Sequence, residues 1–362
     1  MHQQTPLRQL GDHADASPFE AHAPEFAAVL GDAPRLVQVV ATDAHEGPVY
    51  VADEDALYFT TLPRPGDLPA PGFPQVAIKR LALDGDRFPV DPGRVSVVRA
   101  AANMANGMTL DRDGRLVVCE QGTQAEHARI SRLDLASGAV DTVVDTWAGL
   151  RLNSPNDVVV ASDGAVWFTD PSYGYLQGFK PEPLAGDHVY RYDPRSDRLS
   201  VVADSFDKPN GLAFSPDERV LYITDSGANH QPGSYHVGRP HHVVAYDVLH
   251  GRHLTGGRLF AVTTPGFPDG IKVDSAGRVY VSAFSGVQVF DPSGDLIGEI
   301  HLAGAVNFCF GGTGRNVLFI TTDTGVWAAS LHATAPTDLR SPMATTRRGH
   351  DHHDRGPNQK SP

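Results

Sequence analysis

The chain has 362 residues, of which 41% are hydrophobic and 20% charged, so it can bury a sizeable core. Its formal net charge of −13 argues against DNA, RNA or an anionic membrane as a partner and is compatible with a cation or a small neutral ligand. The sequence shows neither a signal-peptide core nor an apolar run of the roughly 18 residues that a transmembrane helix needs. We therefore expect a cytoplasmic protein; the sequence does not indicate its oligomeric state.

The two ends of the chain differ in composition from the middle. Residues 1–32 are expected to form a loose N-terminal arm, and residues 333–362 are polar, charged and Pro-containing, as is typical of a disordered tail. Residues 33–332 show no linker and are expected to form one domain. Cys119 and Cys309 lie in separate apolar runs, so we expect buried free thiols rather than a disulfide.

One pattern recurs six times within this domain. Each copy opens with an acidic or amide residue, continues through a short apolar run to a turn, and closes with a second apolar run. Turns rich in Asp and Gly between β-branched and aromatic runs are the signature of a β-hairpin. The copies are EGPVYVADEDALYFT from Glu46, NGMTLDRDGRLVVCE from Asn106, NDVVVASDGAVWFTD from Asn156, NGLAFSPDERVLYITD from Asn210, DGIKVDSAGRVYVSAF from Asp269 and NFCFGGTGRNVLFITT from Asn307.

Further strands follow most of these hairpins, such as HVYRYDPRSD and then LSVVADSF. Four antiparallel strands in each of six units predict an all-β fold, a six-bladed β-propeller. The sixth unit lacks a fourth strand before the tail begins. We therefore expect residues 36–41 to pair beside residues 325–331, which would close the ring and remove two exposed sheet edges.

The opening residues of the six hairpins should meet at one mouth of the central channel, because the innermost strand of every blade lines that channel. All of them carry side-chain oxygen, which a hard divalent cation such as calcium prefers, whereas zinc would favour His or Cys. The alternative is that Asn and Asp merely form turns before strands, which accounts for one or two such positions but not for six in register. The six are Glu46, Asn106, Asn156, Asn210, Asp269 and Asn307.

The motifs EGPVY, RLNSPNDVVVASDGAVWFTDPSYGY, KPNGLAFSPDERVLYITDSG and FPDGIKVDSAGRVYVSAF resemble those of the SMP-30/gluconolactonase family, and the resemblance covers about residues 40–330. It implies a calcium-dependent lactonase, with magnesium, manganese or zinc as alternative metals. Some members of the family hold a second calcium through an acidic residue at the position of Lys272, so no second ion is expected there. The metal ligands that the resemblance implies are Glu46, Asn156, Asn210 and Asp269.

Lactone hydrolysis needs a polarised carbonyl and a delivered nucleophile. A metal polarises the carbonyl, and an adjacent Asp acts as a general base on water or attacks directly. We assign this catalytic role to Asp269, with Glu46 as the charge-balancing ligand. The second strand of each hairpin returns to the same mouth, where further groups should border the site, namely Glu120, Asp170, Tyr173, Asp225 and Asp323. The residues expected to contact substrate are Asn106, Glu120, Arg151 and Asn307.

These features predict an enzyme that opens a sugar lactone such as glucono-1,5-lactone to the aldonic acid. The chain contains no GxSxG motif, so a serine hydrolase is not expected. Two alternatives stay open at this point. One is a metal-dependent esterase or phosphotriesterase on the same scaffold, and the other is a non-enzymatic propeller that binds a ligand through its face.

Overall fold

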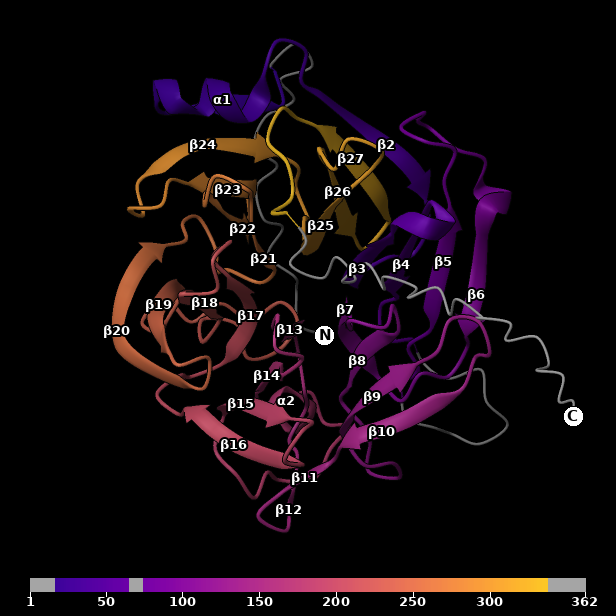
Figure 1. The fold of residues 1–362 in the computed structure, drawn as a ribbon, viewed down its shortest axis with the longest axis vertical. Helices are drawn as coiled ribbons and strands as arrows, with labels where there is room; N and C mark the ends of the chain where they lie inside the picture. The colour runs from indigo at the N-terminus through magenta and orange to yellow at the C-terminus, as the bar shows by residue number, and fades with distance from the viewer. Residues whose placement is uncertain (1–16, 65–73, 338–362) are drawn as a thin grey trace, which may run out of the picture.

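The computed structural model describes residues 17–64 and 74–337. Six antiparallel sheets of four or five strands stand around a central axis (Figure 1). In each sheet the strand nearest the axis comes from the first half of one sequence repeat. The predicted six-bladed β-propeller is confirmed.

Each of the first three blades follows the chain from the axis outward. Blade one consists of β3 (Glu46–Val51), β4 (Ala56–Thr60), β5 (Ile78–Ala82) and β6 (Val95–Arg99). Blade two consists of β7 (Ala105–Leu110), β8 (Leu116–Glu120), β9 (Arg129–Leu133) and β10 (Val140–Val144). Blade three consists of β13 (Val158–Val160), β14 (Val166–Asp170), β15 (His188–Asp193) and β16 (Arg198–Ala203).

The other three blades have the same order, with strands from the N-terminal part of the chain added at two outer edges. Blade four consists of β17 (Pro209–Phe214), β18 (Val220–Asp225), β19 (His242–Leu249) and β20 (His253–Val262). Blade five consists of β21 (Ile271–Val273), β22 (Val279–Ala283), β23 (Gly286–Phe290), β24 (Leu296–His301) and β1 (Phe19–Ala21). Blade six consists of β25 (Asn307–Gly311), β26 (Val317–Thr322), β27 (Gly325–Ser330) and β2 (Arg35–Ala41).

Short elements connect the strands. A small hairpin of two strands lies between blades two and three, and short helices occur in the loops. They are β11 (Thr146–Trp147), β12 (Leu150–Arg151), α1 (Ala27–Leu30), α2 (Tyr173–Leu176), η1 (Pro24–Phe26), η2 (Ala52–Glu54) and η3 (Pro92–Arg94). No helix among the described residues is long and apolar enough to cross a membrane.

The ring is closed by a strand from the N-terminal side of the chain. β2 pairs antiparallel with β27, with Leu36 opposite Ala329 and Ala41 opposite Gly325. This is the closure that the missing fourth strand of the sixth repeat predicts. It joins the first and last parts of the propeller in one sheet, so the outer edge of blade six is formed by a strand far away in sequence.

The described part of the N-terminal arm packs against the propeller. β1 pairs with β24 of blade five, and α1 lies along the outer side of that blade (Figure 1). Phe26 and Val29 are fully buried there, because they join the apolar cluster between blades five and six. Residues 17–32 therefore extend the fifth blade; residues 1–16 lie outside the described residues.

The first residues of the predicted tail also contact the propeller. Ala333 is buried, and the backbone of Thr334 and Ala335 bonds to Ser275 and Arg315 at the hairpin turns of blades five and six. The remainder of the tail, residues 338–362, lies outside the described residues.

The apolar core is divided into six clusters, each between two neighbouring blades. The cluster between blades three and four, for example, contains Trp167, Leu212 and Ile223. The core therefore joins blades to each other and leaves the axis free for polar groups. Cys119 and Cys309 are buried free thiols, as expected.

Glycine allows the innermost strands to approach each other closely around the axis. In four of the six repeats the residue after the opening acid or amide is Gly. A Cβ atom on Gly107 would lie 2.5 Å from the Asn156 carbonyl oxygen, and one on Gly211 would lie 2.4 Å from the Asp269 carbonyl oxygen. Real side chains do not make such contacts, so these glycines set the spacing between neighbouring opening residues.

We predict that Gly211→Ala lowers the free energy of unfolding by about 1–3 kcal/mol, the usual range for overpacking. The added methyl group would collide with backbone atoms, which have no rotamer to relieve the contact. Chemical denaturation of the metal-free protein measures the effect. Gly238→Ala is the control, because nothing lies within 4 Å of a Cβ there. Equal stability of the two variants would contradict the close approach.

Candidate functional site

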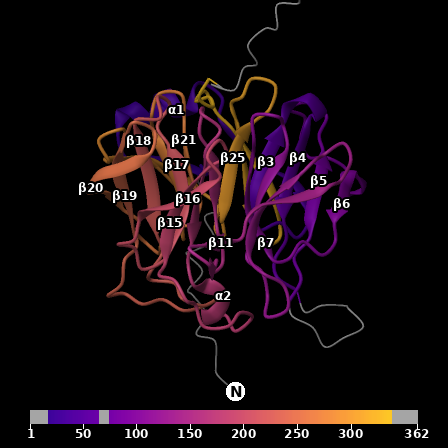
Figure 2. The same cartoon turned by 60° about the horizontal axis from the view of Figure 1, so that its bottom comes forward.

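A cavity of about 330 Å³ opens at one end of the central channel. Five of the six opening residues line it, and α2 lies at the same end of the ring (Figure 2). The structure thus brings together residues separated by more than two hundred positions in sequence. They are Glu46, Asn106, Asn156, Asn210 and Asp269.

Hydrogen bonds between blades fix the backbone of these residues. The hydroxyl of Thr169, near the end of β14, donates to the Asn210 carbonyl oxygen at 2.7 Å. Thr224 makes the equivalent bond to Asp269 at 3.0 Å, and Thr60 bonds to Asn106 at 3.2 Å. The Thr near the end of a second strand therefore positions the opening residue of the next blade.

Two strand-end acids hold the loops that carry the asparagines. Asp170 accepts hydrogen bonds at 2.8 Å from the backbone N–H groups of Asn153 and Ser154, just before Asn156. In blade four, Asp225 does the same for residues 207 and 208, just before Asn210. Both carboxylates are buried and do not line the cavity. They shape the site by fixing its loops.

Three carboxyl groups lie close together on the axis, those of Glu46 and Asp157 buried and that of Asp269 half-buried. Burial raises the pKa of Glu46, and the neighbouring charge of Asp269 raises it further. Burial and the charge of Asp157 likewise raise the pKa of Asp269, and burial also raises that of Asp157. Such mutual repulsion in a buried site is relieved by a cation or by protonation.

The donor set fits a hard cation. Among the described residues no group of three or more His, Cys, Asp or Glu side chains can hold a metal, so amide oxygens have to complete any ligand set. The Oδ1 atoms of Asn106 and Asn156 are buried at the cavity and have no hydrogen-bond partner among the described residues. Unpartnered buried oxygens beside repelling carboxylates are the surroundings that calcium or magnesium requires.

Asn307, the sixth opening residue, does not line the cavity. Its side-chain N–H donates to Glu46 Oε2 at 2.7 Å, and its Oδ1 accepts from the Phe308 N–H and from Lys272 Nζ. β25 pairs with β26 without the register shift that follows the opening residue in blades one, two and four. Asn307 therefore supports Glu46 from within the ring, and the structure does not bring it to the expected substrate position.

Glu120 is fully buried in an ion-pair network away from the cavity. Its carboxylate bonds to Arg99 at 2.5 Å, Arg129 at 2.8 Å, Ser131 at 2.7 Å and Asn103 at 3.0 Å. Burial alone would raise its pKa, but the hydrogen bond and charge of Arg99, with help from Ser131 and Arg129, hold the pKa of Glu120 below its usual value. The structure thus gives Glu120 no free oxygen for a substrate.

Arg151 also lies away from the cavity. It ends β12 in the small hairpin between blades two and three, where it is exposed. Asp323 does line the cavity, as expected for a strand-end residue, and its Oδ1 atom lies 2.8 Å from Nδ1 of His45. Asp323 lies in the tight turn between β26 and β27, whereas Arg151 belongs to an extra hairpin between two blades that the repeat pattern does not predict.

Loops of blades three and four form one wall of the cavity. Tyr173 and Gln177 come from the α2 region, and Asn229 comes from the loop after β18. Gln231 donates to the Leu176 carbonyl oxygen at 2.8 Å, which joins the two loops. The two amides, Gln177 and Asn229, and also Asp157 were not among the residues predicted from the sequence. The only signal for Asp157 is that it occupies a place where most repeats have Gly.

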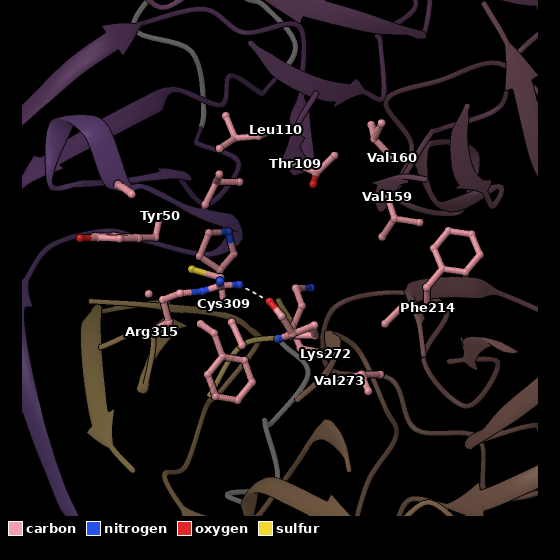
Figure 3. A pocket seen from close by; sticks show the side chains of 18 of the residues that line it. Tyr50, Thr109, Leu110, Val159, Val160, Phe214, Lys272, Val273, Cys309 and Arg315 are labelled. Carbon is pink, nitrogen blue, oxygen red and sulfur yellow. Dashed lines mark hydrogen bonds between the residues drawn. The ribbon is translucent and has the colours of Figure 1, made fainter. Parts of the chain in front are cut away.

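A larger cavity of about 890 Å³ lies at the opposite end of the channel (Figure 3). Its walls are mostly aliphatic and aromatic side chains from the far ends of the innermost strands, such as Val159, Phe214 and Val273, with Lys272 and Cys309 between them. The carboxyl and amide side chains that could take part in catalysis line the smaller cavity instead. The candidate site is therefore the smaller one.

A six-bladed propeller with a carboxylate- and amide-lined cavity on its axis defines the class of protein. A model of the SMP-30/Gluconolactonase/LRE-like region matches residues 44–324, and the chain belongs to this family. It is 30% identical to a gluconolactonase of Zymomonas mobilis over 84% of this chain and 83% of that protein. It is 28% identical to the lactonohydrolase oryL of Aspergillus oryzae over 83% and 71% of the two chains.

The chain also resembles solved structures. The chain is similar to XC5397 of Xanthomonas campestris, a gluconolactonase, with a TM-score of 0.70 and 34% identity over 88% of this chain and 96% of that one. It shares the fold of a calcium-binding regucalcin of Agrobacterium tumefaciens, with a TM-score of 0.62 and 16% identity over 84% of this chain and 95% of that one. The family recognised in the sequence motifs is confirmed.

We predict that Glu120→Gln lowers the free energy of unfolding by about 3 kcal/mol at neutral pH, because it removes the charge that the two buried arginine contacts need. The folded state lowers the pKa of Glu120 from 4.5, so its contribution is present above the pKa of the unfolded chain and is lost as pH falls through the folded value. Denaturation at several pH values tests this. A stability gap that does not shrink in acid would contradict the network.

Proposed function

We propose that the protein is a metal-dependent lactonase that opens a small sugar lactone such as glucono-1,5-lactone to its aldonic acid. The observation that carries the proposal is the meeting of Glu46, Asn156, Asn210 and Asp269 at one small cavity on the propeller axis. The gluconolactonase and lactonohydrolase names of the relatives support the same reaction. Family membership makes an enzyme of this kind the simplest account of such a site.

In this proposal Glu46, Asn156, Asn210 and Asp269 hold one divalent cation, with calcium as the first choice. Two of the four are carboxylates, which balance the charge of one such ion. When bound, the ion supplies positive charge that polarises a lactone carbonyl. Magnesium, manganese or zinc are the alternatives, and zinc suits this set least, since it contains no His or Cys.

The chain's own residues carry the proton transfers. Asp269 accepts a proton from the attacking water as the new C–O bond forms. The same proton passes to the ring oxygen when the bond between that oxygen and the carbonyl carbon breaks. The products are a hydroxyl group and a carboxylic acid on one open chain. Glu46, held by Asn307, keeps its position through the reaction and balances charge.

The cavity suits a small ligand rich in hydroxyl groups. Its volume of about 330 Å³ is at the lower end of the usual range for ligand sites. Gln121, Gln177 and Asn229 line it, and each amide both donates and accepts hydrogen bonds, as sugar hydroxyls do. Among the residues expected to contact substrate, Asn106 is the one at the cavity wall.

We predict that the protein hydrolyses glucono-1,5-lactone and that chelation abolishes this activity. The repelling carboxylates leave the site without a polarising charge once the cation is removed. Acid release from a panel of lactones, an aryl ester and a phosphotriester, with and without EDTA, measures the reaction, and elemental analysis should find one divalent ion per chain. Lactone turnover that EDTA leaves unchanged would refute the proposed metal dependence. A preference for the aryl ester or phosphotriester would reassign the substrate.

We predict that Asp269→Asn lowers kcat at least about a hundredfold even at saturating metal, because an amide is neither a base nor a nucleophile. Metal affinity should also fall, since the site loses half of the formal charge of its ligand set. Asn106→Asp is the control, because it adds charge at the cavity without supplying the proposed reactive group. If metal-saturated Asp269→Asn stays within about tenfold of the wild type, or about 1.4 kcal/mol, Asp269 is a ligand only.

A further inference from the structure

One buried hydroxyl at the cavity forms no well-aligned hydrogen bond with any residue that the structure describes. Tyr173 begins α2, lines the cavity and is only 5% exposed. Its hydroxyl lies close to Ser226 and Asn210, but it forms no hydrogen bond of good geometry with any described residue. Most buried polar groups in folded proteins are hydrogen-bonded, so an unpaired hydroxyl that lines a cavity is available to a ligand bound there.

Other buried tyrosines of the chain show the contrast. The hydroxyl of Tyr280 donates to Asp274 at 3.0 Å, that of Tyr58 donates to Glu54 at 2.8 Å, and that of Tyr190 lies 3.2 Å from the His188 ring. These groups are satisfied within the fold. The Tyr173 hydroxyl differs because its surroundings include the cavity and the proposed metal ligands Asn210 and Asp269.

The backbone around Tyr173 is held rigidly. The Gly174 N–H donates to Ser154 Oγ at 2.9 Å, and the Ser172 N–H bonds to the Asp187 carboxylate. A Cβ atom on Gly174 would lie 2.6 Å from Ser154 Oγ, so only glycine permits this contact. Because Ser154 belongs to the same loop as Asn156, this hydrogen bond fixes Tyr173 relative to the proposed metal ligand Asn156. A rigid donor beside a reacting centre needs little reorganisation during reaction.

We propose that Tyr173 is a catalytic residue whose hydroxyl donates a hydrogen bond to the lactone carbonyl oxygen as that oxygen becomes anionic. This inference rests on the proposed function. The tyrosine keeps its proton throughout, so the transfer from water to Asp269 and then to the ring oxygen balances without it. The hydroxyl lies close to Asn210, and Tyr173, Asn210 and Asp269 all line the same cavity. It is therefore placed to reach the carbonyl oxygen of a lactone bound in that cavity.

The test is Tyr173→Phe, assayed on the metal-loaded enzyme with glucono-1,5-lactone. We expect kcat to fall about 100-fold, the effect of removing one donor to a developing oxyanion, with KM within about threefold of wild type. Metal content should stay at that of the wild type. The thermal midpoint of the metal-free variant should not fall, because the lost hydroxyl forms no well-aligned hydrogen bond with the described residues. If Tyr173 were only structural, the substitution would lower the thermal midpoint or the metal content together with the activity.

Tyr280→Phe is the matched control. It removes a buried hydroxyl that is bonded to Asp274, so the thermal midpoint should fall while kcat stays that of the wild type. If the wild type is active and Tyr173→Phe retains more than a third of the wild-type kcat, the proposed catalytic role of Tyr173 is refuted and the lactonase proposal stands. If Tyr173→Phe loses metal or stability together with activity, the residue is structural. If the wild type hydrolyses no lactone, both proposals fail.

Discussion

The close packing of the six innermost strands around one axis is the constraint on which the site depends. Glycines such as Gly107 and Gly211 let backbone meet backbone, and threonines such as Thr169 and Thr224 hold the next blade's carbonyl oxygen. The backbone positions of Asn106, Asn210 and Asp269 are therefore set by contacts that do not involve their own side chains. These side chains can take part in chemistry, because they are not what holds the strands together.

That freedom explains how the axis tolerates an unfavourable set of groups. The carboxylates of Glu46, Asp157 and Asp269 repel one another at the axis, and the Oδ1 atoms of Asn106 and Asn156 have no hydrogen-bond partner among the described residues. Apolar clusters between the blades supply the stability that this arrangement lacks. Folding and function are thus carried by different layers of each blade: the outer layers pack, and the inner edge concentrates polar oxygen.

The repeat pattern, the closure by β2 and the meeting of five of the six opening residues at one cavity could be predicted from the sequence, since strand alternation and turn chemistry are local properties. The roles of the strand-end acids could not. Glu120, Asp170 and Asp323 all end or follow a second strand, yet one joins arginines, one holds a loop, and one lines the cavity. Which of these happens depends on the loop that returns past the strand end. Asn307 is likewise withheld from the cavity by tertiary contacts, because its side chain is bonded to Glu46, the Phe308 N–H and Lys272.

The two parts of the candidate site differ in how they are held, and this has consequences for specificity. The carboxyl and amide oxygens belong to strand ends fixed by the ring, whereas Gln177 and Asn229 come from loops of blades three and four that contact each other at their tips. Changes in those loops alter the shape and hydrogen bonding of the wall without moving the ring. Tyr173 lies between these two parts, because the next residue, Gly174, is hydrogen-bonded to Ser154 in the loop that carries Asn156. A propeller of this kind can therefore keep one reaction centre while its loops select among lactones of different ring size and hydroxyl pattern.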